Sequence, residues 1–206
     1  PARRGLVMSS GGPIEVHLRD RRDGGRKLLV PYVTGGLGNW TDLIRALADA
    51  GADAIEVGIP FSDPAMDGPT IQEASEQALR TGTTPGTVFS GLRGVDAGVP
   101  LIAMTYYNLV FHMGEERFAG EMADAGLRGI ILPDVPLEEQ GPWRAAADDV
   151  GVETVLMAGP ITPDDRLARI TKHIPPQKLI PAALQLVDIA GIVIYIPANL
   201  YPMLST

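Results

Sequence analysis

The segment from Ala54 to Thr70 holds the residues best suited to chemistry. One carboxylate, Glu56, lies in a run that is otherwise apolar. Burying an ionised carboxylate without a partner is so costly that the group either pairs or has its pKa raised until it holds a proton. A glutamic acid whose pKa is near neutrality can act as a general acid or base. Its position alone equally allows a structural ion pair or a hydrogen bond in the core.

The loop at 60–69 follows this run and contains three prolines and two aspartates. Each proline fixes φ and removes a hydrogen-bond donor, so the loop is stiff. A stiff loop could hold Asp67 above the strand that carries Glu56, which would place two carboxylates in different environments and give them different roles. The alternative is that Asp63 or Asp67 forms an Asx turn or a helix cap.

These residues need a framework, and the chain alternates short apolar runs with amphipathic segments. Parallel sheets require this alternation, because each crossover between neighbouring strands needs a helix. The sequence therefore predicts an α/β fold. Six runs are expected to be buried strands: Leu28–Thr34, Ala54–Pro60, Leu101–Tyr107, Gly129–Val135, Glu153–Ala158 and Gly191–Pro197.

A barrel is favoured over an open doubly wound sheet, because the turn at 34–38 does not match the GxGxxG pattern of that fold. Polar residues also follow the strand ends, where barrel enzymes build their active sites. They are Thr34, Ser62, Asp63, Asn108 and Asp134. Helix starts are expected at Thr41, at a Thr70/Glu73 capping box, at Thr84-Pro85, after Gly114 and at Thr162-Pro163.

Composition excludes several classes of protein. With 45% hydrophobic and 20% charged residues and no apolar run of about 18, the chain is expected to be globular and soluble. Residues 1–27 lack the apolar core of a secretory signal. Without cysteine there is no disulfide, thiolate metal site or cysteine nucleophile, which suits a cytosolic enzyme.

Charge and histidine spacing argue against two further functions. The 25 acidic residues outnumber the 17 basic ones, which disfavours nucleic-acid binding. The basic cluster at 19–27 is interrupted by Asp20 and Asp23. His17, His112 and His173 have no second ligand at helical spacing, so no metal site is expected.

Several motifs resemble the tryptophan synthase α subunit family, and the resemblance runs from residue 28 to about residue 170. Glu56–Pro64 followed by Asp67–Gln72 is similar to that family's signature. Tyr106–Phe111 and Asp134–Glu139 are similar to the ends of its third and fourth strands. Because the matches keep one order and spacing, the resemblance is specific, and it implies a (β/α)8 TIM-type barrel.

The resemblance implies retro-aldol cleavage of indole-3-glycerol phosphate to indole and glyceraldehyde 3-phosphate, with no cofactor in this chain. Glu56 would protonate indole C3 and help to take up the glycerol hydroxyl proton. Asp67 would stabilise positive charge at the indole nitrogen. Tyr32, Ile71 and Tyr106 would line the indole pocket, although Tyr32 stands where the family often has Phe and could equally fill the core.

The resemblance also implies a partner, a pyridoxal-phosphate β subunit that receives the indole in an α2β2 assembly. The interface would include Pro60, Asp63, Asp134 and Pro136 at the mouth of the barrel. It further implies a cytoplasmic enzyme that takes a small phosphorylated substrate and contacts neither nucleic acid nor membrane.

One domain is expected for residues 1–206, with an N-terminal segment at 1–27, family-like β/α units at 28–172 and a divergent or incomplete tail at 173–206. Such barrels run to about 250 residues, so the last one or two β/α units are expected to be missing or altered. The tail offers no glycine-rich turn after Gly191 for the substrate phosphate.

Because of this tail, we expect an open barrel with unpaired strand edges and little lyase activity of the chain alone. Three alternatives remain open. The chain could be a stand-alone lyase that releases indole, an interaction subunit that activates a β partner without turnover, or an unrelated phosphosugar barrel in which Glu56 is structural.

Overall fold

The computed structural model describes residues 12–157, 183–189 and 192–197, and their strands form one sheet. The order across the sheet is β5-β4-β3-β2-β1-β7-β6, and all neighbours from β1 to β5 are parallel. The strands are β1 (Val30–Thr34), β2 (Ile55–Gly58), β3 (Leu101–Met104), β4 (Leu127–Ile131), β5 (Glu153–Val155), β6 (Ala183–Ile189) and β7 (Ile192–Pro197).

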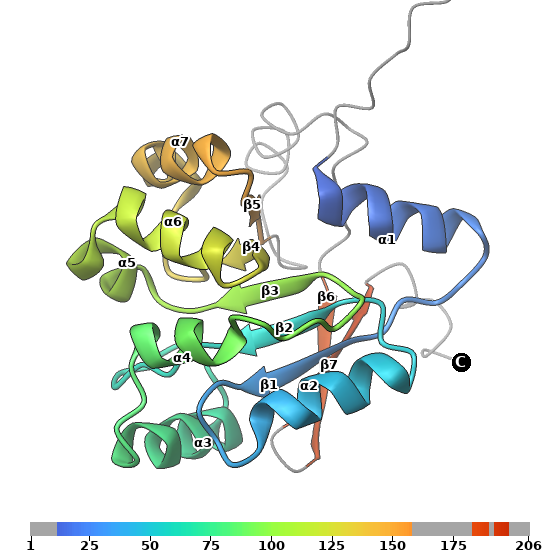
Figure 1. The fold of residues 1–206 in the computed structure, drawn as a ribbon, viewed down its shortest axis with the longest axis horizontal. Coiled ribbons are helices and arrows are strands. Elements are labelled where there is room, and N and C mark those ends of the chain that lie inside the picture. The colour runs from blue at the N-terminus through green and yellow to red at the C-terminus, as the bar shows by residue number, and fades with distance from the viewer. Residues whose placement is uncertain (1–11, 158–182, 190–191, 198–206) are drawn as a thin grey trace, which may run out of the picture.

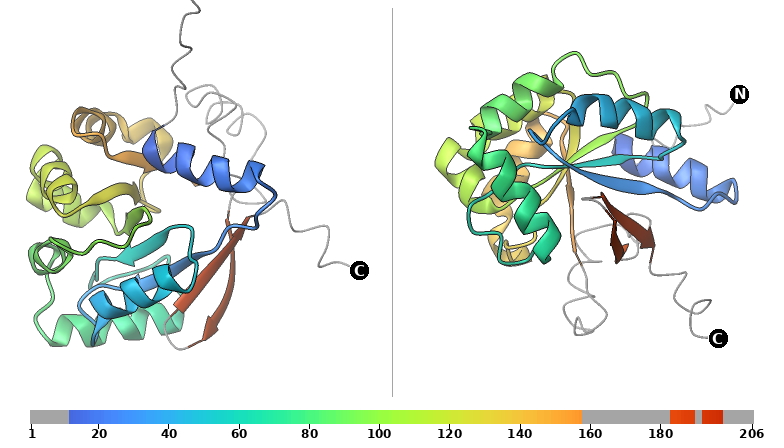
Figure 2. Two further views of the ribbon diagram at one scale, coloured as in Figure 1. Left: turned by 45° about the vertical axis from the view of Figure 1, so that its right-hand side comes forward. Right: turned by 90° about the horizontal axis from the view of Figure 1, so that it is seen from below.

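Helices fill the connections between the parallel strands and cover one side of the curved sheet (Figures 1 and 2). The main core lies between this side and the helices, and it includes Ile55, Phe89, Phe118 and Trp143. The helices are α1 (Pro13–Asp23), α2 (Trp40–Asp49), α3 (Pro69–Arg80), α4 (Pro85–Leu92), α5 (Tyr107–Met113), α6 (Glu115–Asp124) and α7 (Gly141–Asp149), with a 3-10 turn, η1, at Leu137–Glu139. No helix in the described ranges is long and apolar enough to span a membrane.

The predicted α/β class is confirmed, and five of the predicted runs overlap the parallel strands β1 to β5. Most observed strands are shorter than the predicted runs, and two differences have a clear cause or consequence. Strand β4 begins two residues before the predicted Gly129, and β3 ends at Met104 because α5 begins at Tyr107. The sequence also predicted Gly191–Pro197 as a strand of a parallel sheet. That direction is wrong, because β7 pairs antiparallel with β1.

Strand β6 was not predicted, and it explains the direction of β7. Only two residues separate β6 from β7, so the two strands form an antiparallel hairpin. A parallel pair would need a crossover of about a dozen residues or more. The described sheet therefore ends at β5 on one side and at β6 on the other.

At two helices, the residues of the first turn determine where the helix begins. Helix α4 starts as predicted, because the Thr84 hydroxyl accepts the Thr87 N–H at 3.2 Å in a capping box. The predicted Thr70 cap of α3 is wrong, since Pro69 occupies the first turn and Gly68 is the cap. A proline is preorganised for the first helical position, so the helix begins before Thr70.

Helix α1 was not predicted, and it lies at the end of the sheet where the strands begin (Figure 1). The Glu153 carboxylate accepts the Ile14 N–H at 2.5 Å and so caps the start of α1. Gly12 allows this approach, because a Cβ there would lie 2.2 Å from the Glu153 side chain.

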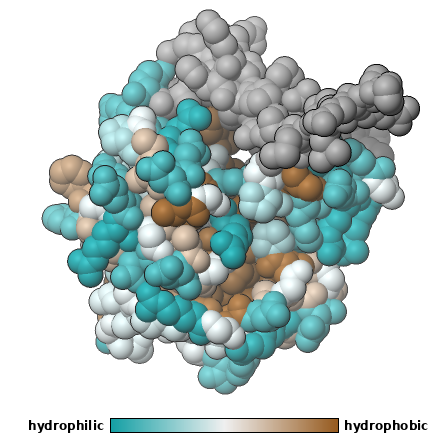
Figure 3. Space-filling view, turned by 45° about the horizontal axis from the view of Figure 1, so that its top comes forward, coloured by the Kyte–Doolittle hydropathy of each residue, from teal (hydrophilic) through white to brown (hydrophobic). Residues whose placement is uncertain are grey.

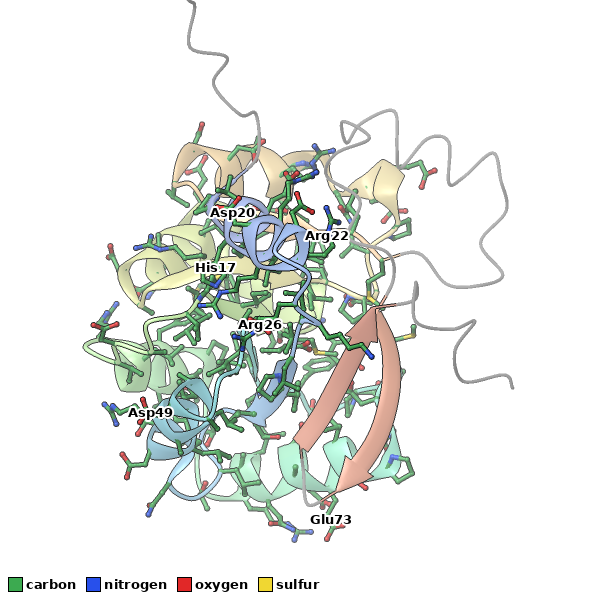
Figure 4. All side chains as sticks on the ribbon, turned by 90° about the vertical axis from the view of Figure 1, so that its right-hand side faces the viewer. His17, Asp20, Arg22, Arg26, Asp49 and Glu73 are labelled. Carbon is green, nitrogen blue, oxygen red and sulfur yellow. The ribbon has the colours of Figure 1, made fainter. Side chains whose placement is uncertain are left out.

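The other end of α1 is held by the buried carboxylate of Asp53, just before β2. Asp53 pairs with Arg21 at 2.9 Å and with Arg26 at 3.0 Å, and it accepts the Leu29 N–H at 2.8 Å. Arg26 lies between α1 and the end of α2 that carries Asp49 (Figure 4). Part of the basic cluster at 19–27 therefore stabilises the fold.

Candidate active site

The site is built on the side chains that alternate toward the inside of the curved sheet. Strand register places Tyr32 beside Glu56, and Glu56 beside Ile102. Two residues further along, Thr34 lies beside Gly58 and Gly58 beside Met104. Because residues i and i+2 of a strand share one face, these are two successive layers of the interior. The second layer is nearer the carboxyl ends of the strands.

Glu56 lies in the deeper layer, and its side chain is almost fully enclosed, with 1% of its surface exposed. The strand β2 that carries it is buried along its whole length. The sequence prediction of a buried carboxylate in an apolar strand is therefore confirmed. The enclosed carboxyl group is positioned by the backbone of β2 and by the neighbours on either side.

Tyr32 lies beside Glu56 and reaches into the second layer. Its hydroxyl lies over Gly58, where an added Cβ would approach the hydroxyl oxygen to 1.7 Å. Gly58 therefore leaves the space that the phenol fills. Burial raises the pKa of Tyr32, and the charges of Glu56 and Asp67 raise it further, so the phenol remains a neutral hydrogen-bond donor.

Asp67 lies in the loop between β2 and α3 and is partly exposed. The Tyr106 hydroxyl accepts the Met66 N–H at 2.9 Å and also lies within hydrogen-bonding range of the Asp67 carboxylate. Burial raises the pKa of Asp67, and the hydrogen bond with Tyr106 lowers it in part. Burial likewise raises the pKa of Tyr106 to about 12. The loop is thus held by a tyrosine at the end of the neighbouring strand.

An apolar wall completes the site. Tyr32, Ile71 and Met104 form one buried cluster, with Ile131 packed against it. Phe61 stacks on Tyr106 with ring centroids 5.2 Å apart. The structure therefore brings the predicted Tyr32 and Ile71 together, and it joins the predicted Tyr106 to Asp67. Met104 and Phe61 were not predicted, although Met104 lies two residues before Tyr106, at the end of the same apolar run.

The four residues predicted at a partner interface lie in two loops of the same rim. Asp63, Asp134 and Pro136 are exposed, whereas Pro60 is buried. Both carboxylate oxygens of Asp134 lie 3.1 Å from the Tyr107 nitrogen. Asp134 therefore accepts the hydrogen bond of an N–H group in the first turn of α5. Only three of the four side chains are therefore available on the surface of this chain.

The outer surface provides few other features of a site. In the view of Figure 3, apolar residues form small groups separated by hydrophilic ones. A cleft of about 450 Å³ lies between the loop after β2 and α3, with Phe61, Ser62, Gln72 and Glu73 among its walls. Within residues 12–157 and the two later strands, no cluster of three or more His, Asp or Glu could hold a metal ion. His173 lies outside the described residues.

The fold and the site define an α/β-barrel protein with two carboxylates, one enclosed within the sheet and one in a loop at the rim. Residues 18–175 match the family model for the tryptophan synthase alpha chain. The chain belongs to the tryptophan synthase alpha chain family.

Relatives and solved structures agree with this assignment. A tryptophan synthase alpha chain of Methanosarcina mazei is 40% identical over 76% of this chain and 58% of its own length. One of Streptomyces coelicolor is 45% identical over 68% of this chain and 51% of its own. The tryptophan synthase subunit alpha of Legionella pneumophila has a TM-score of 0.74 and 32% identity, covering 80% of this chain and 65% of that one. The chain thus spans little more than half the length of these two curated relatives.

Proposed function

We propose that this chain supplies the catalytic carboxyl groups for the α reaction of tryptophan biosynthesis, the cleavage of indole-3-glycerol phosphate to indole and glyceraldehyde 3-phosphate. The proposal rests on the presence of two different carboxyl groups beside one apolar wall. Glu56 is enclosed, and Asp67 lies at the rim. A flat aromatic ring fits the wall of Tyr32, Ile71 and Met104. The reaction needs both an acid–base group and an anion, and these two carboxylates differ in the way that such roles require.

The bond to be broken joins indole C3 to the hydroxyl-bearing carbon of the glycerol chain. In our mechanism, Glu56 gives its proton to C3, and the positive charge that develops at the ring nitrogen is stabilised by Asp67. Glu56 then takes the proton of the adjacent hydroxyl as that oxygen becomes the aldehyde. The electrons of the broken carbon–carbon bond return to the ring and restore the indole, so the step needs no external oxidant or reductant.

The exclusion of water from the site favours both the proton transfers and the stabilisation of charge. A carboxyl group shielded from water exchanges protons with the substrate rather than with solvent, and charge stabilisation is stronger where water is excluded. Tyr106 positions the second carboxylate, since its hydroxyl holds both Met66 and Asp67. Asp67 must be ionised for its role, and the hydrogen bond from Tyr106 favours that state.

The mechanism is tested by two isosteric substitutions. Glu56→Gln cannot transfer a proton and should abolish indole formation while the thermal unfolding transition is retained. Asp67→Asn cannot match a developing cation and should reduce turnover about a hundredfold. Turnover of Glu56→Gln within tenfold of the parent would remove Glu56 from the mechanism. A change confined to KM in Asp67→Asn would make Asp67 a binding residue.

We further propose that the partner is a tryptophan synthase β subunit in an α2β2 assembly, that pyridoxal phosphate belongs to that partner, and that this chain itself uses no cofactor. Exposed Asp63 and Pro136 and the neighbouring cleft at Phe61 support a docking surface on this rim. A cytoplasmic location is also proposed, because phosphorylated intermediates are retained there. Copurification with the β subunit from the cytoplasmic fraction tests the proposed partner and the proposed location.

A further inference from the structure

Thr34 ends strand β1 inside the site and has a feature that the proposed mechanism does not use. Its side chain is 3% exposed, and its hydroxyl oxygen has no hydrogen-bond partner among the described residues. A buried hydroxyl without a partner is unfavourable, because it has lost its hydrogen bonds to water and gained none. Such groups are rare in folded proteins, and they call for a ligand or a water molecule.

The strand geometry places this hydroxyl on the ligand side of the sheet. Thr34 shares a face with Tyr32, and its neighbour across the sheet is Gly58, which has no side chain. The Tyr32 hydroxyl fills part of the space over Gly58 and lies close enough to the Thr34 hydroxyl to have its pKa lowered in part by it, although the two do not make a hydrogen bond of normal geometry. Two hydroxyl groups therefore lie together in the layer directly above Glu56, and Tyr32 belongs to the same buried cluster as Met104 and Ile71.

We propose that Thr34 is a specificity-determining residue whose hydroxyl binds a hydroxyl group of the ligand next to the carbon on which Glu56 acts. The inference rests on the proposed function, because it takes the side chain of indole-3-glycerol phosphate as the hydroxyl-bearing ligand. A hydroxyl can both donate and accept, so it suits the secondary alcohols of a glycerol chain. A site built in this way rejects an analogue that lacks the hydroxyl, since the buried partner is then left unsatisfied.

Two ligands that differ only in these hydroxyls test the proposal. They are indole-3-glycerol phosphate and indole-3-propanol phosphate, and their dissociation constants are measured by NMR titration. All proteins carry Glu56→Gln so that the substrate is not consumed. Thr34→Val, which keeps the shape but not the hydroxyl, should weaken binding of the glycerol ligand about five- to tenfold. Binding of the propanol ligand should change less than about twofold, and Thr34→Ser should restore the selectivity.

A matched control is Thr105→Val. Thr105 is also fully buried, but its hydroxyl already donates to the Ile59 carbonyl at 3.1 Å. Its loss should lower stability and leave the ratio of the two dissociation constants unchanged. An unchanged ratio in Thr34→Val, with both ligands bound, would overturn this inference and leave the proposed function standing. If neither ligand bound to the protein with native Thr34, the proposed function and this inference would both be wrong.

Discussion

Replacing Tyr106 with phenylalanine separates the role of one hydroxyl from that of the ring that carries it. The ring can keep its stack on Phe61, whose centroid is 5.2 Å away. The hydroxyl is lost, and with it the acceptor of the Met66 N–H at 2.9 Å and the hydrogen bond to Asp67. Met66 lies in an exposed part of the loop, so we expect water to replace the lost acceptor of its N–H. The main effect should therefore fall on Asp67.

The size of this effect follows from the environment of the carboxylate. A hydrogen bond to a charged group contributes about 1.5–3 kcal/mol. Asp67 is partly exposed, so water compensates in part and the lower end of this range applies. About 1.5 kcal/mol corresponds to a roughly tenfold fall in turnover.

The loss should also depend on pH, and its sign can be worked out. Burial raises the pKa of Asp67, and the hydrogen bond with Tyr106 lowers it in part. Without the hydroxyl the pKa rises further, so a smaller fraction of Asp67 is ionised at a given pH. Because the mechanism needs the carboxylate, activity should fall most on the acid side, and the acid limb of the profile should move to higher pH.

The assay is the rate of indole formation at saturating substrate, measured from acid to neutral pH so that the acid limb of the profile is covered. Tyr107→Phe is the control, because it also removes a hydroxyl that donates to a carboxylate, that of Glu115 at 2.6 Å, but away from the two catalytic groups. The control should stay within twofold of the parent. Equal pH profiles for Tyr106→Phe and Tyr107→Phe would refute the reasoning.

Two other predictions concern the stability of the fold and the partner. Asp53→Asn should lower the free energy of unfolding by about 2–3 kcal/mol, below the full cost of breaking a buried ion pair because Arg21 and Arg26 are partly exposed. Urea denaturation measures this, and a change under about 0.5 kcal/mol would mean that the ion pairs are not stabilising. Addition of a tryptophan synthase β subunit should slow hydrogen exchange in segments 60–63 and 134–139, and unchanged exchange in both would place the partner elsewhere.

Much of the framework could be predicted because it depends on local patterns. Strands β1 to β5 are short apolar runs, and a carboxylate such as Glu56 is conspicuous in one of them. The start of α4 was predictable because Thr84 caps its own helix. These signals lie within a few residues of the structure that they specify.

What could not be predicted depends on residues that are distant in the sequence. Asp53 looks like an ordinary turn residue, and its pairing with Arg21 across 32 positions follows only from the docking of α1. The fit of the Tyr32 hydroxyl over Gly58 likewise depends on strand register. Helix α1 is rich in charged residues and has no side-chain cap of its own, so its stability comes from tertiary contacts that no local pattern shows.

The capping of α1 by Glu153 has a consequence for the order of folding. The donor and the acceptor of that hydrogen bond are 139 positions apart, so α1 leaves the ribosome long before its cap exists. Its arginines can pair with Asp53 much earlier, once β2 has been made. We therefore expect α1 to dock in two stages during synthesis, first by its carboxyl end and only later by its amino end. Helix α1 precedes the other described elements in the chain, and it is then among the last of them to become fixed.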